Sequence, residues 1–242
     1  MAAVAIRLFI DERLSADATI AADGKQAHQL RHVMRRADGD EVLLFNGRDG
    51  EWRATLSLVG KRDVIFKLAE QTRPQTAEPG PWLLIALIKR APLDLVVEKA
   101  TELGASAILP VMTERTNAER ANTERLSAIA REAAEQCGRL TVPEMHAPQA
   151  LMSALAKWPG ERKLFLMDET HRGIPAAEGF AKAAGPAAIL IGPEGGFAQT
   201  ELDALTNLPF VNALDLGIRV LRAETAAIAA LACYQAVAGD WR

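Results

Sequence analysis

The spacing of hydrophobic residues changes its character near residue 80. Before that point, short apolar runs lie between glycine or charged turns, and they predict four strands at residues 6–10, 41–46, 51–59 and 63–69. One helix interrupts these strands. Asp23 and Gln26 have the spacing of a capping box, which predicts a helix that continues to about Arg36. The first part of the chain is therefore predicted to be a small β-barrel with one helix.

A polar, proline-rich run separates this region from the rest of the chain. Residues 71–82 read QTRPQTAEPGPW, in which three prolines and a glycine break any regular element. We interpret this run as an interdomain linker. The sequence predicts one domain over residues 1–73 and a second over residues 74–242.

After the linker, predicted strands alternate with predicted helices. The strands are expected at residues 83–89, 105–112, 164–167, 187–191 and 211–216. The helices are expected from Pro92 to residue 103, from a cap at Asn122, at 200–208 and at 223–238. The apolar run at 83–89 is continuous, as is typical of a strand buried on both faces of a parallel sheet. The pattern indicates an α/β domain.

Composition and charge narrow the class of protein. The 242 residues carry 28 Lys and Arg against 31 Asp and Glu, a net charge of −3, which excludes a generic polycation. Cys137 and Cys233 lie far apart, with no CxxC pair, so we expect reduced cysteines and no metal site. The uncharged stretch 225–239 is shorter than the ~20 residues that span a bilayer. We expect a soluble, cytoplasmic protein without a membrane segment.

Two strand-to-helix junctions stand out as candidate ligand loops. GPEGGF follows the strand at 187–191, and LGIRVLRAETA accompanies the end of the strand at 211–216. In open α/β sheets ligands bind beyond the carboxyl ends of the strands, and glycines let the backbone come close to them. Each junction alone could be an ordinary tight turn. No GxGxxG follows the domain's first strand and no GxxxxGK[ST] occurs, which disfavours dinucleotide and P-loop sites.

The two loops carry a resemblance to a known group of enzymes. IGPEGGF followed by LGIRVLRAETA is similar to the cofactor loops of the knotted SPOUT methyltransferases. Three further segments resemble the ribosomal RNA small subunit methyltransferase E family: HQLRHVMRRADGDEVLLFNG, LIKRAPLDLVVEKATELGASAILPVMTERT and AREAAEQCGRLTVPEMH. The resemblance covers almost the whole chain. It implies a PUA-like barrel, a trefoil-knotted α/β domain, S-adenosylmethionine as cofactor, a homodimer, and methylation of N3 of a specific uridine in 16S rRNA.

The resemblance also implies which residues contact the cofactor. They belong to the two loops and the start of the last helix: Ile191, Gly192, Pro193, Glu194, Gly195, Gly196, Leu216, Gly217, Ile218, Leu221, Arg222, Ala223, Glu224, Thr225 and Ala226. The physical interpretation agrees with this implication. The adenine would be bound by backbone groups in an apolar slot, and the methionine carboxylate would lie near the N-terminus of the last helix.

Two charged residues are candidates for the chemistry. Uracil N3 is a poor nucleophile until it loses its proton, after which negative charge spreads onto O2 and O4. Arg222 is expected to stabilise a uracil oxygen, and Glu194 is the candidate proton acceptor, since arginine stays protonated. The alternative is that Arg222 and Glu224 form a salt bridge that only holds the loops together.

Contact with RNA requires a basic surface that the net charge conceals. The candidates are a run without acidic residues in the first domain and several residues of the second: Lys25, His28, Arg31, Arg35, Arg36, Lys89, Arg90, Arg115, Arg131 and Arg139. A solvated helix face is the alternative for the first group. His28 and His32 have a spacing suited to a metal, but no third ligand is evident.

Two other functions remain open on the sequence. One is a different SPOUT activity, such as ribose 2′-O methylation, and the other is a non-catalytic RNA-binding or assembly factor. Cofactor binding distinguishes the binding factor from the enzymes. The last helix is rich in alanine and could pack against its own core or against a second subunit; the resemblance favours the subunit.

Overall fold

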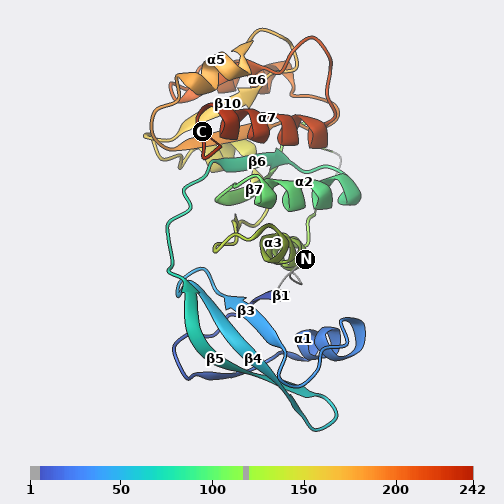
Figure 1. Ribbon diagram of the computed structural model, residues 1–242. Helices are drawn as coiled ribbons and strands as arrows, with labels where there is room; N and C mark the ends of the chain where they lie inside the picture. The colour runs from blue at the N-terminus through green and yellow to red at the C-terminus, as the bar shows by residue number, and fades with distance from the viewer. Residues whose placement is uncertain (1–5, 117–119, 242) are drawn as a thin grey trace. The chain divides into compact units, whose positions relative to one another are not determined.

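The computed structural model describes residues 6–116 and 120–241 (Figure 1). The chain forms two compact units. One contains the described residues up to Ala77 together with Ala134–Thr141, and the other contains Glu78–Ala133 and the residues from Val142 onward. Each unit has a sheet of its own.

The N-terminal unit is built on a mixed five-stranded sheet. Its strands are β1 (Ile6–Phe9), β2 (Thr19–Ala21), β3 (Glu41–Phe45), β4 (Glu51–Val59) and β5 (Asp63–Arg73), in the order β1-β3-β4-β5-β2. β1 is parallel to β3 and the other pairs are antiparallel. Alternate residues such as Leu44, Leu56 and Phe66 are fully buried and form the core, as the period of two in a half-buried strand requires.

The four strands predicted for this unit are confirmed, with two differences. β5 continues to Arg73, four residues beyond its predicted end, because Arg73 still pairs with Glu51 of β4. The connection to the next strand therefore begins at residue 74. β2 was not predicted, since three residues are too few to show an alternating pattern.

The predicted capping box is also confirmed. Gln26 N donates to Asp23 Oδ1 at 2.7 Å, and Asp23 N donates to Gln26 Oε1 at 3.2 Å. The helix α1 (Gly24–His28) continues into one π-helical segment, η1 (Gln29–Val33), in which Leu30 is fully buried. The predicted end at Arg36 is wrong by three residues, and Arg35 has a left-handed φ of 52°.

The C-terminal unit contains a parallel eight-stranded sheet. Its strands are β6 (Trp82–Ala86), β7 (Ala107–Met112), β8 (Glu144–Met145), β9 (Gln149–Ala150), β10 (Lys163–Met167), β11 (Ile174–Pro175), β12 (Ala187–Ile191) and β13 (Val211–Asp215). The order is β11-β13-β10-β12-β6-β7-β8, and β9 also pairs with β7. The five longer strands match the predicted ones, although β6 ends at Ala86 rather than at Lys89.

Helices cover both faces of this sheet. They are α2 (Arg90–Glu102), α3 (Thr123–Cys137), α4 (Leu151–Leu155), α5 (Ala176–Ala181), α6 (Gln199–Thr206) and α7 (Ala223–Val237). One core joins α2, α3, α5 and α7 to one face of the sheet, and a second joins α4 and α6 to the other. Consecutive residues of β12 enter opposite cores: Ile189 lies in the first and Leu190 in the second. This burial on both faces explains the continuous apolar run.

The helix boundaries follow the signals expected from the sequence. Gly104 comes directly after the C-cap of α2 with a φ of 79°, a conformation that favours glycine. Asn122 Oδ1 accepts the N–H of Arg125 at 2.9 Å at the start of α3. The short elements α4, α5, β8, β9 and β11 were not predicted. Among the described residues, no helix is long and apolar enough to cross a membrane.

Arg7 anchors the segment Ala134–Thr141 within the N-terminal unit. Its guanidinium pairs with Glu51 at 2.7 Å and donates to the carbonyls of Ala134 and Arg139, both at 2.8 Å. It also lies 4.4 Å from the centroid of the Phe45 ring. The side chains of Arg7 and Glu51 are only 11% and 5% exposed. The guanidinium therefore satisfies carbonyls near the end of α3 as well as a buried carboxylate.

We expect Arg7→Met to lower the free energy of unfolding by about 3–5 kcal/mol, because Glu51 would lose its close partner in a buried site. Arg53→Met is the matched control. Arg53 pairs with Glu70 at 2.6 Å on the surface of the same unit, so its loss should cost at most about 1 kcal/mol. Denaturant unfolding of both variants measures the difference. Equal losses of unfolding free energy in the two variants would show that the buried contacts of Arg7 stabilise the unit no more than a surface ion pair does.

Candidate active site

The strand order brings three loops to one edge of the C-terminal sheet. β10 lies between β13 and β12, and all three strands are parallel. Their carboxyl ends therefore meet at the same edge, followed by the loops 168–173, 192–198 and 216–222. The sequence singled out the second and third loops. The first loop lies between them in space, although it precedes both in the chain.

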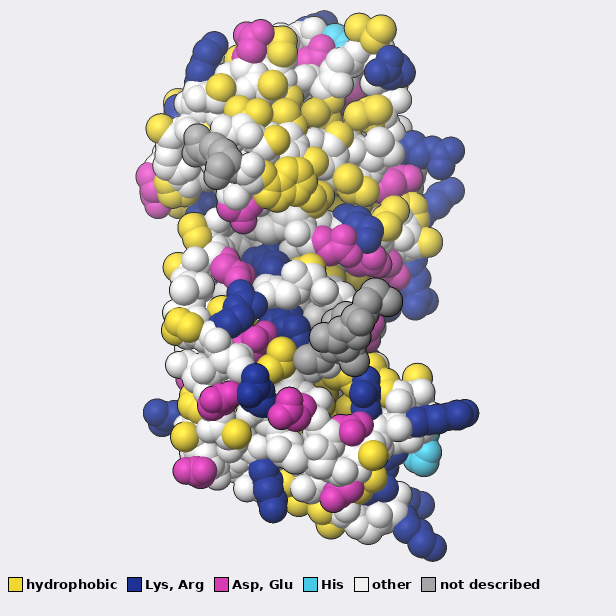
Figure 2. Space-filling view, in the orientation of Figure 1, with side chains coloured by type: hydrophobic (Ala, Val, Ile, Leu, Met, Phe, Trp, Pro, Cys, Tyr) yellow, Lys and Arg dark blue, Asp and Glu magenta, His cyan; other side chains and the backbone are white. Residues whose placement is uncertain are grey.

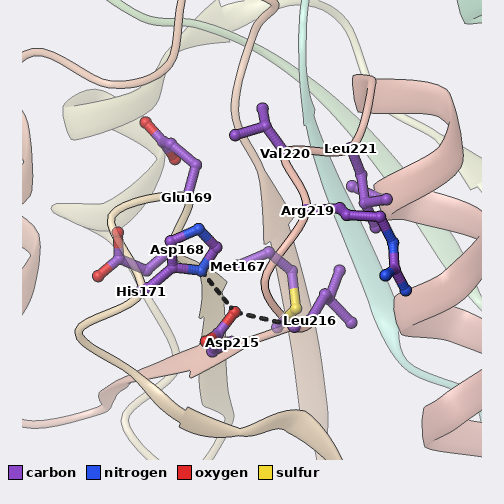
Figure 3. A pocket seen from close by; sticks show the side chains of 11 residues that line it. Met167, Asp168, Glu169, His171, Asp215, Leu216, Arg219, Val220 and Leu221 are labelled. Carbon is purple, nitrogen blue, oxygen red and sulfur yellow. Dashed lines mark hydrogen bonds and ion pairs between the residues drawn. The ribbon is translucent and has the colours of Figure 1, made fainter.

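A pocket opens between the β10 loop and the β13 loop (Figure 3). It encloses about 350 Å³ of space, part of which is open to solvent. The residues that line it come from the ends of β10 and β13, the following loops and α7: Met167, Asp168, Glu169, His171, Asp215, Leu216, Gly217, Arg219, Val220, Leu221 and Ala226. Leu216, Gly217, Leu221 and Ala226 were expected as cofactor contacts.

The glycine-rich loop after β12 is fixed to the β10 loop by Glu169. Glu169 Oε1 accepts the N–H of Phe197 at 3.0 Å and occupies the space that a Cβ on Gly196 would need. Gly196 also has a φ of 67°. At Gly192, a Cβ would lie 2.8 Å from the Phe197 ring. The left-handed φ favours glycine at 196, and at 192 the Phe197 ring would have to shift to admit a side chain.

The loop after β13 leads into an open helix N-terminus. α7 begins at Ala223, and no side chain caps the helix at Arg222. Its first N–H groups and its positive dipole end are therefore available to an anion. Ile218 and Val220 in the same loop are 87% and 78% exposed, which is unusual for large apolar side chains.

The two predicted catalytic residues are both at the surface. Glu194 is exposed and, within the described part of the chain, its carboxylate forms no hydrogen bond or ion pair. Arg222 is exposed at the start of α7. No ion pair joins Arg222 to Glu224 among the residues that the structure describes, so the alternative salt bridge is not observed. Neither residue lines the pocket of Figure 3.

A histidine and an aspartate form a hydrogen-bonded pair inside the pocket. His171 Nδ1 lies 3.1 Å from Asp215 Oδ1, which also accepts the N–H of Gly217 at 2.9 Å (Figure 3). The hydrogen bond from His171, followed by that from the Gly217 backbone, lowers the pKa of Asp215 below the usual aspartate value. His171 has a left-handed φ of 59°. The pair joins the β10 loop to the β13 loop.

Comparisons with known proteins agree with this architecture. A family model of an RNA methyltransferase domain matches residues 78–235, and a model of an RNA methyltransferase PUA domain matches residues 22–69. A ribosomal RNA small subunit methyltransferase E from Rickettsia conorii is 33% identical, with 93% of each chain covered. The corresponding Synechocystis protein is 34% identical, and the match covers 95% of this chain and 77% of that protein.

Solved structures give the same result. A ribosomal RNA small subunit methyltransferase E from Neisseria gonorrhoeae, bound to S-adenosylmethionine, has a TM-score of 0.87 at 28% identity and covers 99% of this chain and 100% of that one. A Legionella pneumophila protein in complex with the same cofactor has a TM-score of 0.86 at 29% identity, with 97% and 98% covered.

The chain belongs to the ribosomal RNA small subunit methyltransferase E family. The predicted α/β methyltransferase domain and the PUA-like domain before it are confirmed. The strand order explains how the loops that follow β12 and β13 reach the same edge of the sheet, although α6 and β13 separate them in the chain.

The expected RNA-contacting residues fall into two groups in the structure. In the N-terminal unit Lys25, His28 and Arg35 are exposed on or after α1. Arg31 is instead tied to the β4–β5 hairpin, since its Nη2 donates to Asp63 O at 2.6 Å, and Arg36 lies 3.8 Å from Asp40. Arg139 is half-buried in the segment Ala134–Thr141.

The second group lies on the C-terminal unit. Lys89, Arg90, Arg115 and Arg131 are exposed there. Arg115 Nη1 donates to Gly195 O at 3.1 Å, which places a basic residue against the glycine-rich loop. Among the described residues, no group of three or more His, Cys, Asp or Glu side chains could hold a metal ion.

Sequence reasoning did not identify the residues of the β10 loop. Their signal was present, because Asp-Glu-Thr-His-Arg follows directly after a predicted strand at 164–167. Acidic residues and a histidine at the carboxyl end of a parallel strand are candidates for a site. What the sequence lacked was the strand order that puts β10 between the two loops already singled out.

Proposed function

We propose that this protein is an S-adenosylmethionine-dependent methyltransferase that modifies N3 of one uridine in the 16S rRNA of the small ribosomal subunit. The observation that carries the proposal is the junction of the β10, β12 and β13 loops beside an uncapped helix, in a member of the methyltransferase E family. The cofactor, when bound, supplies an electrophilic methyl group.

The residues of this edge fit such a cofactor. The open N-terminus of α7 suits the methionine carboxylate, because no side chain caps its first N–H groups. We propose that both loops contact it, through Ile191–Gly196, Leu216–Ile218 and Leu221–Ala226. Half-buried Leu216, Leu221 and Ala226 would form the apolar side of the adenine slot.

The charged residues near these loops would act on the uracil. Loss of the N3 proton leaves negative charge on O2 and O4, and Arg222 would stabilise one of these oxygens. Exposed Arg222 lies at the start of α7 without an ion-pair partner on Glu224, so its guanidinium is available. The sequence suggests Glu194, on the exposed turn of the glycine-rich loop, as the proton acceptor, but among the described residues its carboxylate has no partner that orients it.

Membership of the family supports further proposals about the domains, the location and the oligomeric state. We propose that residues 1–73 form the RNA-binding domain and residues 74–242 a trefoil-knotted catalytic domain, and that the protein acts in the cytoplasm. We further propose a homodimer. Figure 2 shows hydrophobic side chains gathered on the C-terminal unit over the region of α7. One side of α7 enters the core, whereas several of its other residues are half-exposed and could contact a second subunit.

The first test is methylation of the proposed substrate. Small ribosomal subunits that lack their native methylation, incubated with this protein and S-adenosylmethionine, should acquire 3-methyluridine, detected by nucleoside mass spectrometry. A 2′-O-methylated nucleoside would instead assign another SPOUT activity. Failure to bind the cofactor in a calorimetric titration would favour a non-catalytic RNA-binding factor.

Removal of the Arg222 guanidinium tests its role. We expect Arg222→Ala to slow methyl transfer by tens-fold or more, because the anionic uracil oxygen loses its stabilising charge, while the thermal unfolding profile stays unchanged. Arg172→Ala is the matched control, since Arg172 is an exposed residue of the neighbouring β10 loop that does not line the pocket. Turnover equal to that of the control would remove Arg222 from the mechanism.

Charge reversal tests the RNA surface of the N-terminal unit. We expect Lys25→Glu combined with Arg35→Glu to weaken rRNA binding and to reduce the slope of log affinity against log salt, because phosphate contacts are lost. Arg31 is left intact, since it holds the β4–β5 hairpin. Lys67→Glu, on an exposed position of β5, is the control. An unchanged salt slope in the double variant would show that RNA binds elsewhere.

A further inference from the structure

We propose that His171, oriented by Asp215, accepts the N3 proton of the target uridine. The inference rests on the proposed function and supplies it with a catalytic residue that the sequence did not suggest. It starts from the one feature of the pocket that the cofactor assignment does not use, the hydrogen-bonded imidazole and carboxylate at its wall.

The hydrogen bonds of Asp215 fix the form of the imidazole. Asp215 Oδ1 receives the backbone N–H of Gly217 at 2.9 Å and lies 3.1 Å from His171 Nδ1. These two bonds hold the pKa of Asp215 below its usual range, so the carboxylate is ionised and accepts from Nδ1. In the neutral imidazole the proton then sits on Nδ1, and Nε2 carries the lone pair.

The position of the ring suits a base. Figure 3 shows the second ring nitrogen of His171 pointing away from Asp215, toward the side of the pocket where Glu169 and Val220 lie. The His171 side chain is 39% exposed, so a nucleotide can reach it from solvent. Leu216, Gly217 and Leu221, which are expected to contact the cofactor, line the same pocket. A base and a methyl donor would thus meet in one cavity.

Several charged groups line the pocket around His171. The β10 loop contributes the carboxylates Asp168 and Glu169, and β13 contributes Asp215. Arg219 of the β13 loop is the one Lys or Arg among the pocket-lining residues. An imidazolium formed during the reaction would be stabilised by the nearby carboxylates and would stay paired with Asp215.

The chemistry balances with no further reactant. The N3–H bond breaks and its proton moves to His171 Nε2, while the electron pair remains on N3. The N3–CH₃ bond then forms as the S–CH₃ bond of S-adenosylmethionine breaks, and that electron pair stays on sulfur. The products are 3-methyluridine and S-adenosylhomocysteine, and the imidazolium releases its proton to solvent. Glu194 has no such orienting partner among the described residues.

The test is the pH dependence of single-turnover methyl transfer with saturating S-adenosylmethionine, for the wild type, His171→Ala, Asp215→Asn and Glu194→Gln. We expect the single-turnover rate of His171→Ala to be lower by about 100-fold or more near neutral pH, because a positioned base contributes a rate factor of this order. Its rate should keep rising with pH, whereas the wild-type rate levels off once the histidine is neutral. Added imidazole should restore part of the loss. The rate of Asp215→Asn should lie between the rates of the wild type and His171→Ala, because the imidazole ring loses its orientation.

The readouts separate catalysis from loop structure. Cofactor affinity of His171→Ala, measured by calorimetry, should stay within about threefold of the wild type, and Thr170→Ala in the same loop should leave rate and pH profile unchanged. A plateau retained by His171→Ala, or a loss without imidazole rescue, overturns the proposal; a plateau abolished by Glu194→Gln instead assigns the proton to Glu194. If the wild type forms no 3-methyluridine, the proposed function fails and the inference fails with it.

Discussion

The candidate site depends on the order of three parallel strands. Because β10 lies between β13 and β12, the carboxyl ends of all three meet at one edge of the sheet. The glycine-rich loop, the β13 loop and the start of α7 each carry a few polar or steric features, and none of these would form a site alone. Burial of β12 on both faces fixes its position in the sheet, since Ile189 and Leu190 pack into opposite cores.

Much of this architecture could be predicted from residue patterns, and the exceptions have physical causes. The capping box at Asp23 and Gln26, the glycine after α2 and the long buried strands all depend on local interactions, so their signals lie within a few residues. Elements of two or three residues, such as β2 and β11, exist because a neighbouring strand pairs with them. The order of the strands likewise depends on pairing between segments far apart in the chain. The sequence therefore does not show that the β10 loop lies between the other two loops.

The same distinction applies to the charged residues. The sequence placed Arg31 in a basic run, but its guanidinium bonds to carbonyls of the β4–β5 hairpin. Nothing in the sequence indicates that Arg7 pairs with Glu51 and donates to the Ala134 carbonyl near the end of α3. The sequence identifies a residue as basic, but it does not identify the groups that the residue contacts in the fold. Exposed Arg35 and Lys89 therefore remain better candidates for phosphate contacts than Arg31.

The pocket is lined by two loops that differ in chemistry. The β13 loop and α7 provide apolar side chains and free N–H groups, which suit a ligand with an apolar part and a carboxylate. The β10 loop provides carboxylates and an imidazole, which suit a substrate that must lose a proton. Asp215 stands at the junction: one oxygen accepts from Gly217 of the first loop and from His171 of the second. Any movement of the β13 loop on cofactor binding would therefore also reposition the imidazole.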